Sequence, residues 1–133
     1  MTATLGEAAR SYLGTPWLDS GRSRQGIDCL GLVLCAARDI GVDMDPERSF
    51  NRRTEPAQLR RAIAPHARMV ALANAAPGDI ILLDMTSALQ VGILTSGESL
   101  GFIYSMIDRG VVELKFKADH FRVRGVFRLC GSN

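Results

Sequence analysis

One cysteine stands where a helix is expected to begin. Asp28 is a good N-cap residue, and Gly41 marks the point where this helix should end. The apolar residues between them recur at helical spacing and are Leu30, Val33, Leu34, Ala37 and Ile40. Cys29 therefore falls in the first turn, where free backbone N–H groups and the helix dipole favour a negative charge. Such a setting lowers the pKa of a thiol and makes it a nucleophile.

A second interpretation of Cys29 is that it only packs. Cysteine in an apolar helix is more often a small hydrophobic residue than a nucleophile. Cys35 is turned away from Cys29 on the same predicted helix, and we expect it to pack in the core. The sequence has three cysteines, an odd number, and their spacing fits neither a disulfide framework nor a CxxC zinc site. We therefore expect free thiols, synthesis in a reducing compartment, no metal ion and no cofactor.

The whole chain has the length and composition of an ordinary globular domain. Its 133 residues, 47% of them hydrophobic and 23% charged, suit one domain over residues 1–133 with a sizeable core. The formal net charge of +2 creates no strong field for a polyanion, so no nucleic-acid partner is expected. Residues 1–10 lack the apolar segment of a signal peptide, and no apolar run approaches membrane-spanning length. We therefore expect synthesis in the cytoplasm and no membrane insertion.

Helices are expected in the first half of the chain, over residues 5–13, 29–40 and 55–63. A capping box with Thr4 as the cap opens the first helix, and Gly14 ends it. Thr54 is expected to cap the third. A polar loop over residues 19–26 and a polar surface excursion over residues 43–53 connect these helices.

The second half of the chain is expected to form strands, over residues 80–83, 90–95, 100–106, 111–116 and 121–129. In the last of these, the apolar residues expected on one face are Phe121, Val123 and Phe127. The residues expected on the opposite face are Arg122, Arg124 and Arg128. This arginine face is either solvated or meets an acidic partner. The sequence therefore predicts an α+β fold in which helices precede an antiparallel sheet.

Five short segments resemble the NlpC family of papain-like cell-wall cysteine peptidases. Residues 12–17 (Tyr-Leu-Gly-Thr-Pro-Trp) and 26–33 (Gly-Ile-Asp-Cys-Leu-Gly-Leu-Val) resemble the opening of that family. Residues 77–79 (Pro-Gly-Asp) resemble the turn before its first sheet strand. Residues 90–93 (Gln-Val-Gly-Ile) and 102–105 (Phe-Ile-Tyr-Ser) take the places of the strands that usually carry the catalytic histidine and the third polar residue. The resemblance covers nearly the whole chain and implies a papain-like, NlpC-type fold.

The resemblance also implies a cysteine-peptidase site in which several positions are altered. Cys29 takes the place of the nucleophile that attacks a peptide carbonyl of bacterial peptidoglycan. Gln90 stands at the histidine position, and glutamine cannot serve as a general base. Tyr104 stands at the third polar position. Trp17 stands near the oxyanion, where the family often has a tyrosine.

The remaining site predictions concern substrate binding and a replacement base. Asp28 and Gly92 are predicted to contribute to substrate binding. The sequence contains two histidines, His66 and His120, and neither lies on a strand expected to face Cys29. Either of these histidines, or one from a neighbouring chain, is nevertheless an alternative source of a base.

The length and the cysteine motif most resemble the branch of the family found in the tail tips of phages and gene transfer agents. This resemblance implies a virion-tail location, tail-hub or tail-tip proteins as partners, and delivery by the particle instead of a secretion signal. Two functions follow: a structural tail-tip protein with a degenerate site, or an active peptidoglycan endopeptidase. A thiol-dependent acyl transferase on the same scaffold is a third alternative, since a fold does not determine a function.

Overall fold

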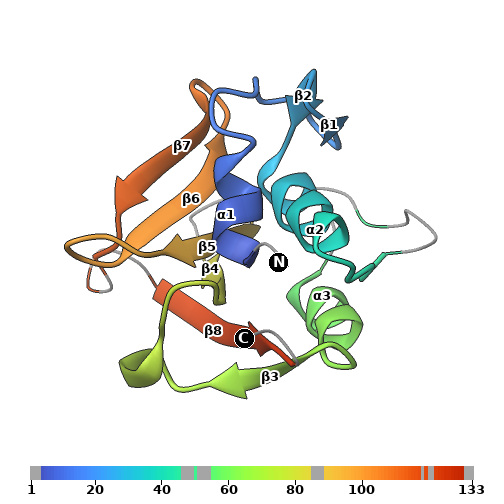
Figure 1. Ribbon diagram of the computed structural model, residues 1–133. Coiled ribbons are helices and arrows are strands. Elements are labelled where there is room, and N and C mark those ends of the chain that lie inside the picture. The colour runs from blue at the N-terminus through green and yellow to red at the C-terminus, as the bar shows by residue number, and fades with distance from the viewer. Residues whose placement is uncertain are drawn as a thin grey trace.

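The computed structural model describes residues 4–45, 50, 55–84, 89–117, 119 and 122–130. Its elements in chain order are α1 (Leu5–Arg10), β1 (Arg22–Ser23), β2 (Gly26–Ile27), α2 (Cys29–Asp39), α3 (Pro56–Ile63), β3 (Ala67–Val70), the 3₁₀ turn η1 (Leu72–Asn74), β4 (Ile80–Asp84), β5 (Leu89–Thr95), β6 (Gly101–Met106), β7 (Gly110–Lys115) and β8 (Arg122–Leu129) (Figure 1). None of the helices in the described part of the chain is long and apolar enough to span a membrane.

The central feature is a six-stranded antiparallel sheet in the order β3-β8-β4-β5-β6-β7. The helices lie along one side of it, with α1 and α2 beside β5 (Figure 1). A first core cluster joins helix residues such as Leu32 to sheet residues such as Ile93. A second cluster lies on the opposite face of the sheet and consists of Ile81, Leu83, Leu94, Phe102, Tyr104 and Val126. The predicted α+β architecture is confirmed.

The helix starts follow from local chemistry. Thr4 forms the predicted capping box with Glu7, but α1 ends at Arg10, one turn earlier than expected. After the helix, Tyr12 and Leu13 donate to the carbonyls three residues before them, and Gly14 donates to the Val111 carbonyl of β7 at 3.1 Å. The cap of α3 is Glu55 rather than the predicted Thr54, which lies outside the described residues. A residue before a proline is restricted to extended backbone, and Glu55 precedes Pro56, so it caps the helix.

The sheet contains one strand that the sequence pattern did not predict. The edge strand β3 has only four residues, and its Met69 is 66% exposed, so it lacks clear apolar alternation. Its pairing with β8 brings Ala67 opposite Leu129. A short edge strand of this kind is defined by its long-range partner rather than by its own residues.

The predicted faces of the last strand are wrong because of a β-bulge. Leu82 pairs with Gly125 and Leu83 pairs with Val123, which leaves Arg124 as the extra residue. An extra residue exchanges the two faces of a strand, since the side-chain period is two. Val123 therefore packs against the second cluster, whereas Phe127 belongs to the first.

Arg128 also departs from the predicted solvated face. Its guanidinium donates to both carboxylate oxygens of Asp79, at 2.8 and 2.9 Å, and to the carbonyl of Asn74. Asp79 is 1% exposed and also accepts the backbone N–H of Ala76. This arginine therefore ties β8 to the turn that starts β4, and it is not available to an acidic partner.

Candidate active site

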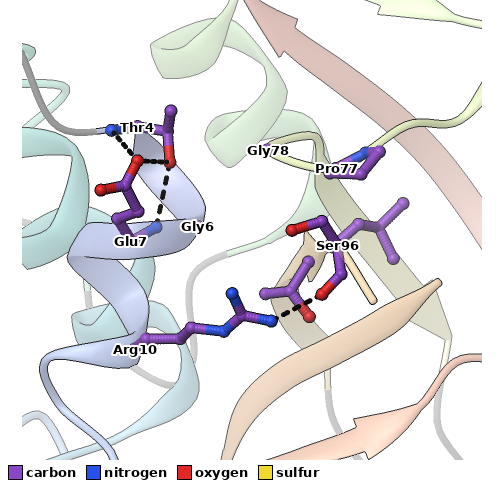
Figure 2. A pocket seen from close by; sticks show the side chains of 9 residues that line it. Thr4, Gly6, Glu7, Arg10, Pro77, Gly78 and Ser96 are labelled. Carbon is purple, nitrogen blue, oxygen red and sulfur yellow. Dashed lines mark hydrogen bonds between the residues drawn. The ribbon is translucent and has the colours of Figure 1, made fainter. Parts of the chain in front are cut away.

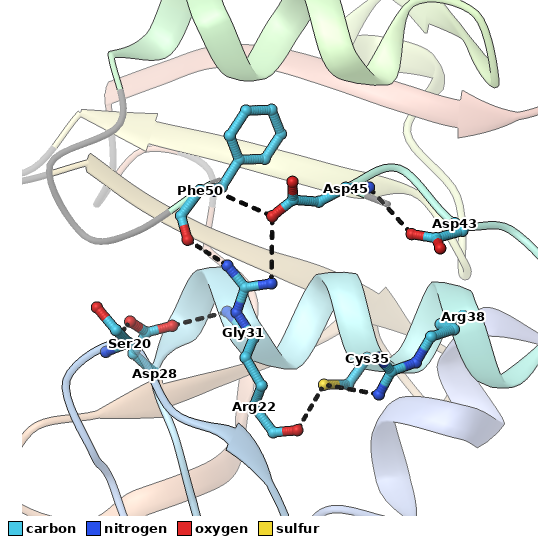
Figure 3. Close-up of polar contacts among 9 residues, drawn as sticks. All are labelled: Ser20, Arg22, Asp28, Gly31, Cys35, Arg38, Asp43, Asp45 and Phe50. Atoms are coloured by element: carbon cyan, nitrogen blue, oxygen red, sulfur yellow. Dashed lines mark hydrogen bonds and ion pairs between the residues drawn. The ribbon is translucent and has the colours of Figure 1, made fainter. Parts of the chain in front are cut away.

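Cys29 is the first residue of α2, and Asp28 is its N-cap as predicted. The Asp28 carboxylate accepts the backbone N–H of Gly31 at 2.7 Å and that of Ser20 at 2.8 Å (Figure 3). A Cβ on Gly31 would lie 2.2 Å from the carbonyl oxygen of Gly21, so only glycine lets the loop cross the helix start this closely. Asp28 is buried, and its oxygens point to backbone groups. Its assignment to substrate binding stays a prediction.

The Cys29 sulfur lies where two strands of the sheet separate. The pairs that join β5 to β6 run from Thr95↔Gly101 to Ile93↔Ile103 within the described strands. Val91 lies beyond the last of these pairs, and its backbone hydrogen-bonds the Cys29 sulfur. The thiol therefore lies against Val91 of β5, past the described β5–β6 pairs, at the end of the two strands that we call the opening between β5 and β6.

Burial determines the protonation of this thiol. The pKa of Cys29 is raised to about 11, with burial as the largest cause and the negative charge of Asp28 as a smaller one. Backbone hydrogen bonds from Val91 and Leu30 lower the pKa, but by less. The sequence-based expectation of a lowered pKa is therefore wrong, because loss of water outweighs the donors at the helix start. At neutral pH Cys29 is a thiol rather than a thiolate.

Gln90 and Tyr104 lie on either side of this opening. Gln90 directly precedes Val91 on β5, and its Oε1 is buried with no hydrogen-bond partner among the described residues. Tyr104 on β6 is 9% exposed and stacks on Phe102, with ring centroids 4.8 Å apart. Burial raises the pKa of Tyr104, Arg109 lowers it, and Cys29 raises it slightly, so the phenol and the thiol are electrostatic neighbours. Neither Gln90 nor Tyr104 can exchange a proton near pH 7.

Trp17 and Gly92 have evident structural roles. Trp17 forms a parallel bridge with Ile27, two residues before Cys29, which places its backbone beside the cysteine segment. A Cβ on Gly92 would lie 2.3 Å from the ring of Phe102, so packing requires glycine there. The predicted oxyanion role of Trp17 and substrate role of Gly92 stay predictions.

The histidines do not complete a dyad in the described structure. His66 lies in the turn between α3 and β3, and β3 is three strands away from β5. Three strand spacings amount to about 14 Å, which is beyond any hydrogen bond. His120 lies outside the described residues. Within the described ranges, no group of three or more His, Cys, Asp or Glu residues could hold a metal ion.

Two polar features near the site were not expected from the sequence. Ser105 on β6 is 2% exposed, and its hydroxyl donates to the Ile27 carbonyl at 2.8 Å. In the loop predicted to be polar, the Arg22 guanidinium donates to Asp45 and to the Phe50 carbonyl (Figure 3). Neither contact has a local sequence signal, because the partners are 23 or more residues apart.

The second cysteine of α2 behaves as predicted. Cys35 is 2% exposed and belongs to the first core cluster. Its sulfur contacts the Arg22 carbonyl at 3.3 Å and lies 3.9 Å from the Arg38 guanidinium (Figure 3). The packing role of Cys35 is confirmed.

A separate hollow of about 200 Å³ lies between the start of α1 and the Thr95 end of β5 (Figure 2). It is lined by Thr4, Gly6, Glu7, Arg10, Pro77, Gly78, Leu94, Thr95 and Ser96. Arg10 donates across it to the Ser96 carbonyl at 2.7 Å, and Glu7 is engaged by the cap of α1. Its charged side chains are thus engaged by other groups, Glu7 by Thr4 and Arg10 by Ser96 and Glu113, and it contains none of the predicted site residues.

Comparisons with known proteins identify the fold. No protein-family model matches the sequence, and no curated protein matches it. The NlpC/p60 domain of the peptidoglycan hydrolase SagA superposes with a TM-score of 0.66 at 17% identity, covering 92% of this chain and 94% of that domain. NlpC2 of Trichomonas vaginalis gives 0.67 at 22% identity over 96% of this chain and 48% of its own. A protein similar to lipoproteins of the NLP/P60 family from Staphylococcus aureus gives 0.64 at 20% identity over 95% of this chain and 40% of its own.

These likenesses establish an α+β, papain-like fold of the NlpC type. This is the fold of cell-wall peptidases, and it agrees with the order of segments along the chain. Sequence identities below 25% to these structures establish a shared fold but not a shared catalytic activity. The chemistry must therefore be argued from the residues at the opening between β5 and β6.

Proposed function

We propose that this chain is a tail-tip, hub-associated subunit of a phage or gene transfer agent, in which an NlpC-type fold serves mainly as structure. What supports a non-catalytic role is Gln90, which the resemblance assigns to the histidine position and which directly precedes Val91, the residue whose backbone hydrogen-bonds the partly buried Cys29 thiol. Nucleophilic catalysis by cysteine needs a thiolate and a partner that carries the proton. Removing a catalytic histidine typically lowers the rate by several powers of ten.

The tail assignment rests on the resemblance of the cysteine motif and chain length to the phage and gene-transfer-agent branch. Its partners are then tail-hub and tail-tip proteins, and its place is the virion tail. The test is to delete the protein from a producing strain and to quantify assembled tails, with mass spectrometry of purified particles from the parent strain. We expect the chain in the particles and a loss of complete tails without it. Normal particles that lack the chain would contradict the assignment.

The catalytic question has its own test. Purified peptidoglycan is incubated with the native chain, with Cys29→Ala and with an active NlpC/p60 hydrolase as a positive control. We expect the native chain and Cys29→Ala to release equally small amounts of soluble fragments at every pH. Particles that carry Cys29→Ala should also deliver their genomes normally.

An active endopeptidase that cleaves peptidoglycan stem peptides is the second candidate. The observation in its favour is that Cys29 lies at the start of α2 with backbone donors from Val91 and Leu30 around its sulfur. Hydrolysis by the native chain that disappears in Cys29→Ala would establish this candidate and overturn the first. Gln90→His then tests whether the missing base limits the rate, because it restores an imidazole at that position.

A further inference from the structure

We propose that Ser105 is the positioning residue that docks the Cys29 segment onto the sheet and holds the partly buried thiol in place. The Ser105 hydroxyl donates to the Ile27 carbonyl at 2.8 Å, across 78 residues of sequence. Both residues are buried, with Ser105 2% and Ile27 0% exposed. This is the one side-chain hydrogen bond described between β6 and the residues just before Cys29.

Ile27 is the point where three parts of the chain meet. Its N–H donates to the Pro16 carbonyl at 2.9 Å, and its own carbonyl also accepts the N–H of Leu18 at 3.3 Å. These two bonds attach Ile27 to the loop of residues 16–18, which is itself a connecting segment. The Ser105 bond is different, because it attaches Ile27 to a central strand of the sheet. Ile27 is followed directly by Asp28 and Cys29, so its position determines theirs.

The bond lies where the sheet itself offers no partner. Ser105 pairs with Val111 of β7 on one side, whereas the described pairs of β6 with β5 end at Ile103. The segment of residues 27–29 lies at this opening. The Ser105 hydroxyl bonds this segment to β6, whereas further along β6 backbone pairing bonds the strand to β5. The opposite wall of the opening is Val91, whose backbone hydrogen-bonds the Cys29 sulfur. Ser105 on one strand and Val91 on the other thus hold the segment between them.

The inference rests on the proposed function in one respect only, namely that Cys29 is a partly buried thiol of low reactivity. Asp28 from the helix cap and Tyr104 from β6 are the titratable groups that act on the thiol. Removal of the Ser105 hydroxyl leaves both groups in place. A change in the titration of Cys29 in such a variant therefore reports movement of the segment.

The experiment measures iodoacetamide alkylation of Cys29 as a function of pH, with peptide mapping to separate it from Cys35 and Cys130. In Ser105→Ala we expect alkylation at pH 8 to be at least about tenfold faster than in the native chain, with the midpoint of the pH profile moving down from about 11 towards the unperturbed value of about 8.5. Ser105→Thr retains the hydroxyl and should restore slow alkylation.

Thr95→Val is the matched control. Thr95 is also a buried strand residue, 1% exposed, and its hydroxyl donates to Glu113 at 2.6 Å at the far end of β5. It should lower the melting temperature to a similar degree but leave the Cys29 profile unchanged. An unchanged profile in a folded Ser105→Ala, or an equal shift in Thr95→Val, would overturn the proposal.

Two features keep the test decisive. If Ser105→Ala does not fold, Ser105→Cys fills the same space with a weaker donor, and an alkylation rate at Cys29 equal to the native rate would refute the docking role. Peptidoglycan hydrolysis by the native chain would overturn the proposed function, whereas an unchanged alkylation profile in Ser105→Ala would overturn the docking role. The two failures are therefore told apart by different measurements.

Discussion

The polar side chains at the two ends of strand β5 differ in whether they have hydrogen-bond partners. At the Thr95 end, the Thr95 hydroxyl and the Arg10 guanidinium both donate to the Glu113 carboxylate, at 2.6 and 2.8 Å. Arg10 also donates to the Ser96 carbonyl. A Cβ on Gly101 would lie 2.4 Å from the Thr95 hydroxyl oxygen, so only glycine at position 101 leaves room for the Thr95 side chain to make this hydrogen bond. Arg10 and Glu113 are thus paired with each other at this end.

At the other end, one polar group is isolated. Gln90 buries an oxygen without a partner among the described residues, next to Val91, whose backbone hydrogen-bonds the partly buried Cys29 thiol. Native structures satisfy nearly all buried polar groups, and exceptions concentrate at sites with a functional history. The contrast shows that the polar groups at one end of β5 form a hydrogen-bonded network, whereas at the other end Gln90 Oε1 has no partner among the described residues.

The largest expected effect concerns the reactivity of Cys29. Because burial raises its pKa to about 11, alkylation at pH 8 should be about two orders of magnitude slower than that of a peptide thiol with a pKa of about 8.5. The measurement is the pH dependence of iodoacetamide alkylation with peptide mapping. A rate plateau already reached at pH 7 would show a poised nucleophile and remove the contrast between the two ends.

The next effect concerns the free energy of unfolding and the N-cap residues of α2 and α1, Asp28 and Thr4. Asp28→Ala removes a buried cap that serves Gly31 and Ser20, so we expect a loss of about 2 kcal/mol in the free energy of unfolding. Thr4→Ala removes the exposed cap of α1 and should cost about 0.5–1 kcal/mol. Urea denaturation of both variants gives the comparison, and Asp28→Asn serves as the conservative control. Equal losses would mean that the cysteine end is no more tightly organised than the surface.

The paired end should be sensitive to acid. The hydrogen bond from Arg10, together with that from Thr95, lowers the pKa of Glu113 below its usual value, and burial opposes this. A carboxyl with a lowered folded pKa contributes stability that is present above the unfolded pKa of about 4.3 and is lost as the pH falls through the folded pKa. Glu113→Gln should therefore lower the melting temperature at pH 7 and show a weaker decline below pH 4.3. Parallel pH profiles for the variant and the native chain would contradict this.

The smallest effect is a change in folding stability that we expect to have opposite signs for substitutions at the two ends of β5. Thr95→Val breaks a satisfied buried hydrogen bond and should cost about 1 kcal/mol. Gln90→Leu removes a buried acceptor without a partner and should leave stability unchanged or raise it by about 0.5 kcal/mol. Thermal denaturation followed by circular dichroism measures both. A loss in Gln90→Leu as large as that in Thr95→Val would show that Gln90 has a structural role.

Much of the architecture was predictable because it depends on neighbouring residues. The cap at Asp28, the capping box at Thr4 and the end of α2 before Gly41, whose φ is +95°, all follow from local backbone chemistry. The strand β3 was not predictable, since it is defined by pairing with β8. The faces of β8 were also missed, because the bulge at Arg124 arises only in the pairing with β4.

The sequence by itself determined which chemistry is available. A cysteine at the start of α2 and a glutamine at position 90 follow from residue identity, and no fold can give an amide a pKa near 7. The tertiary structure alone decided the state of the thiol and the Ser105–Ile27 contact. The reason is that a pKa depends on how much water is excluded, and residues far apart in the chain exclude it.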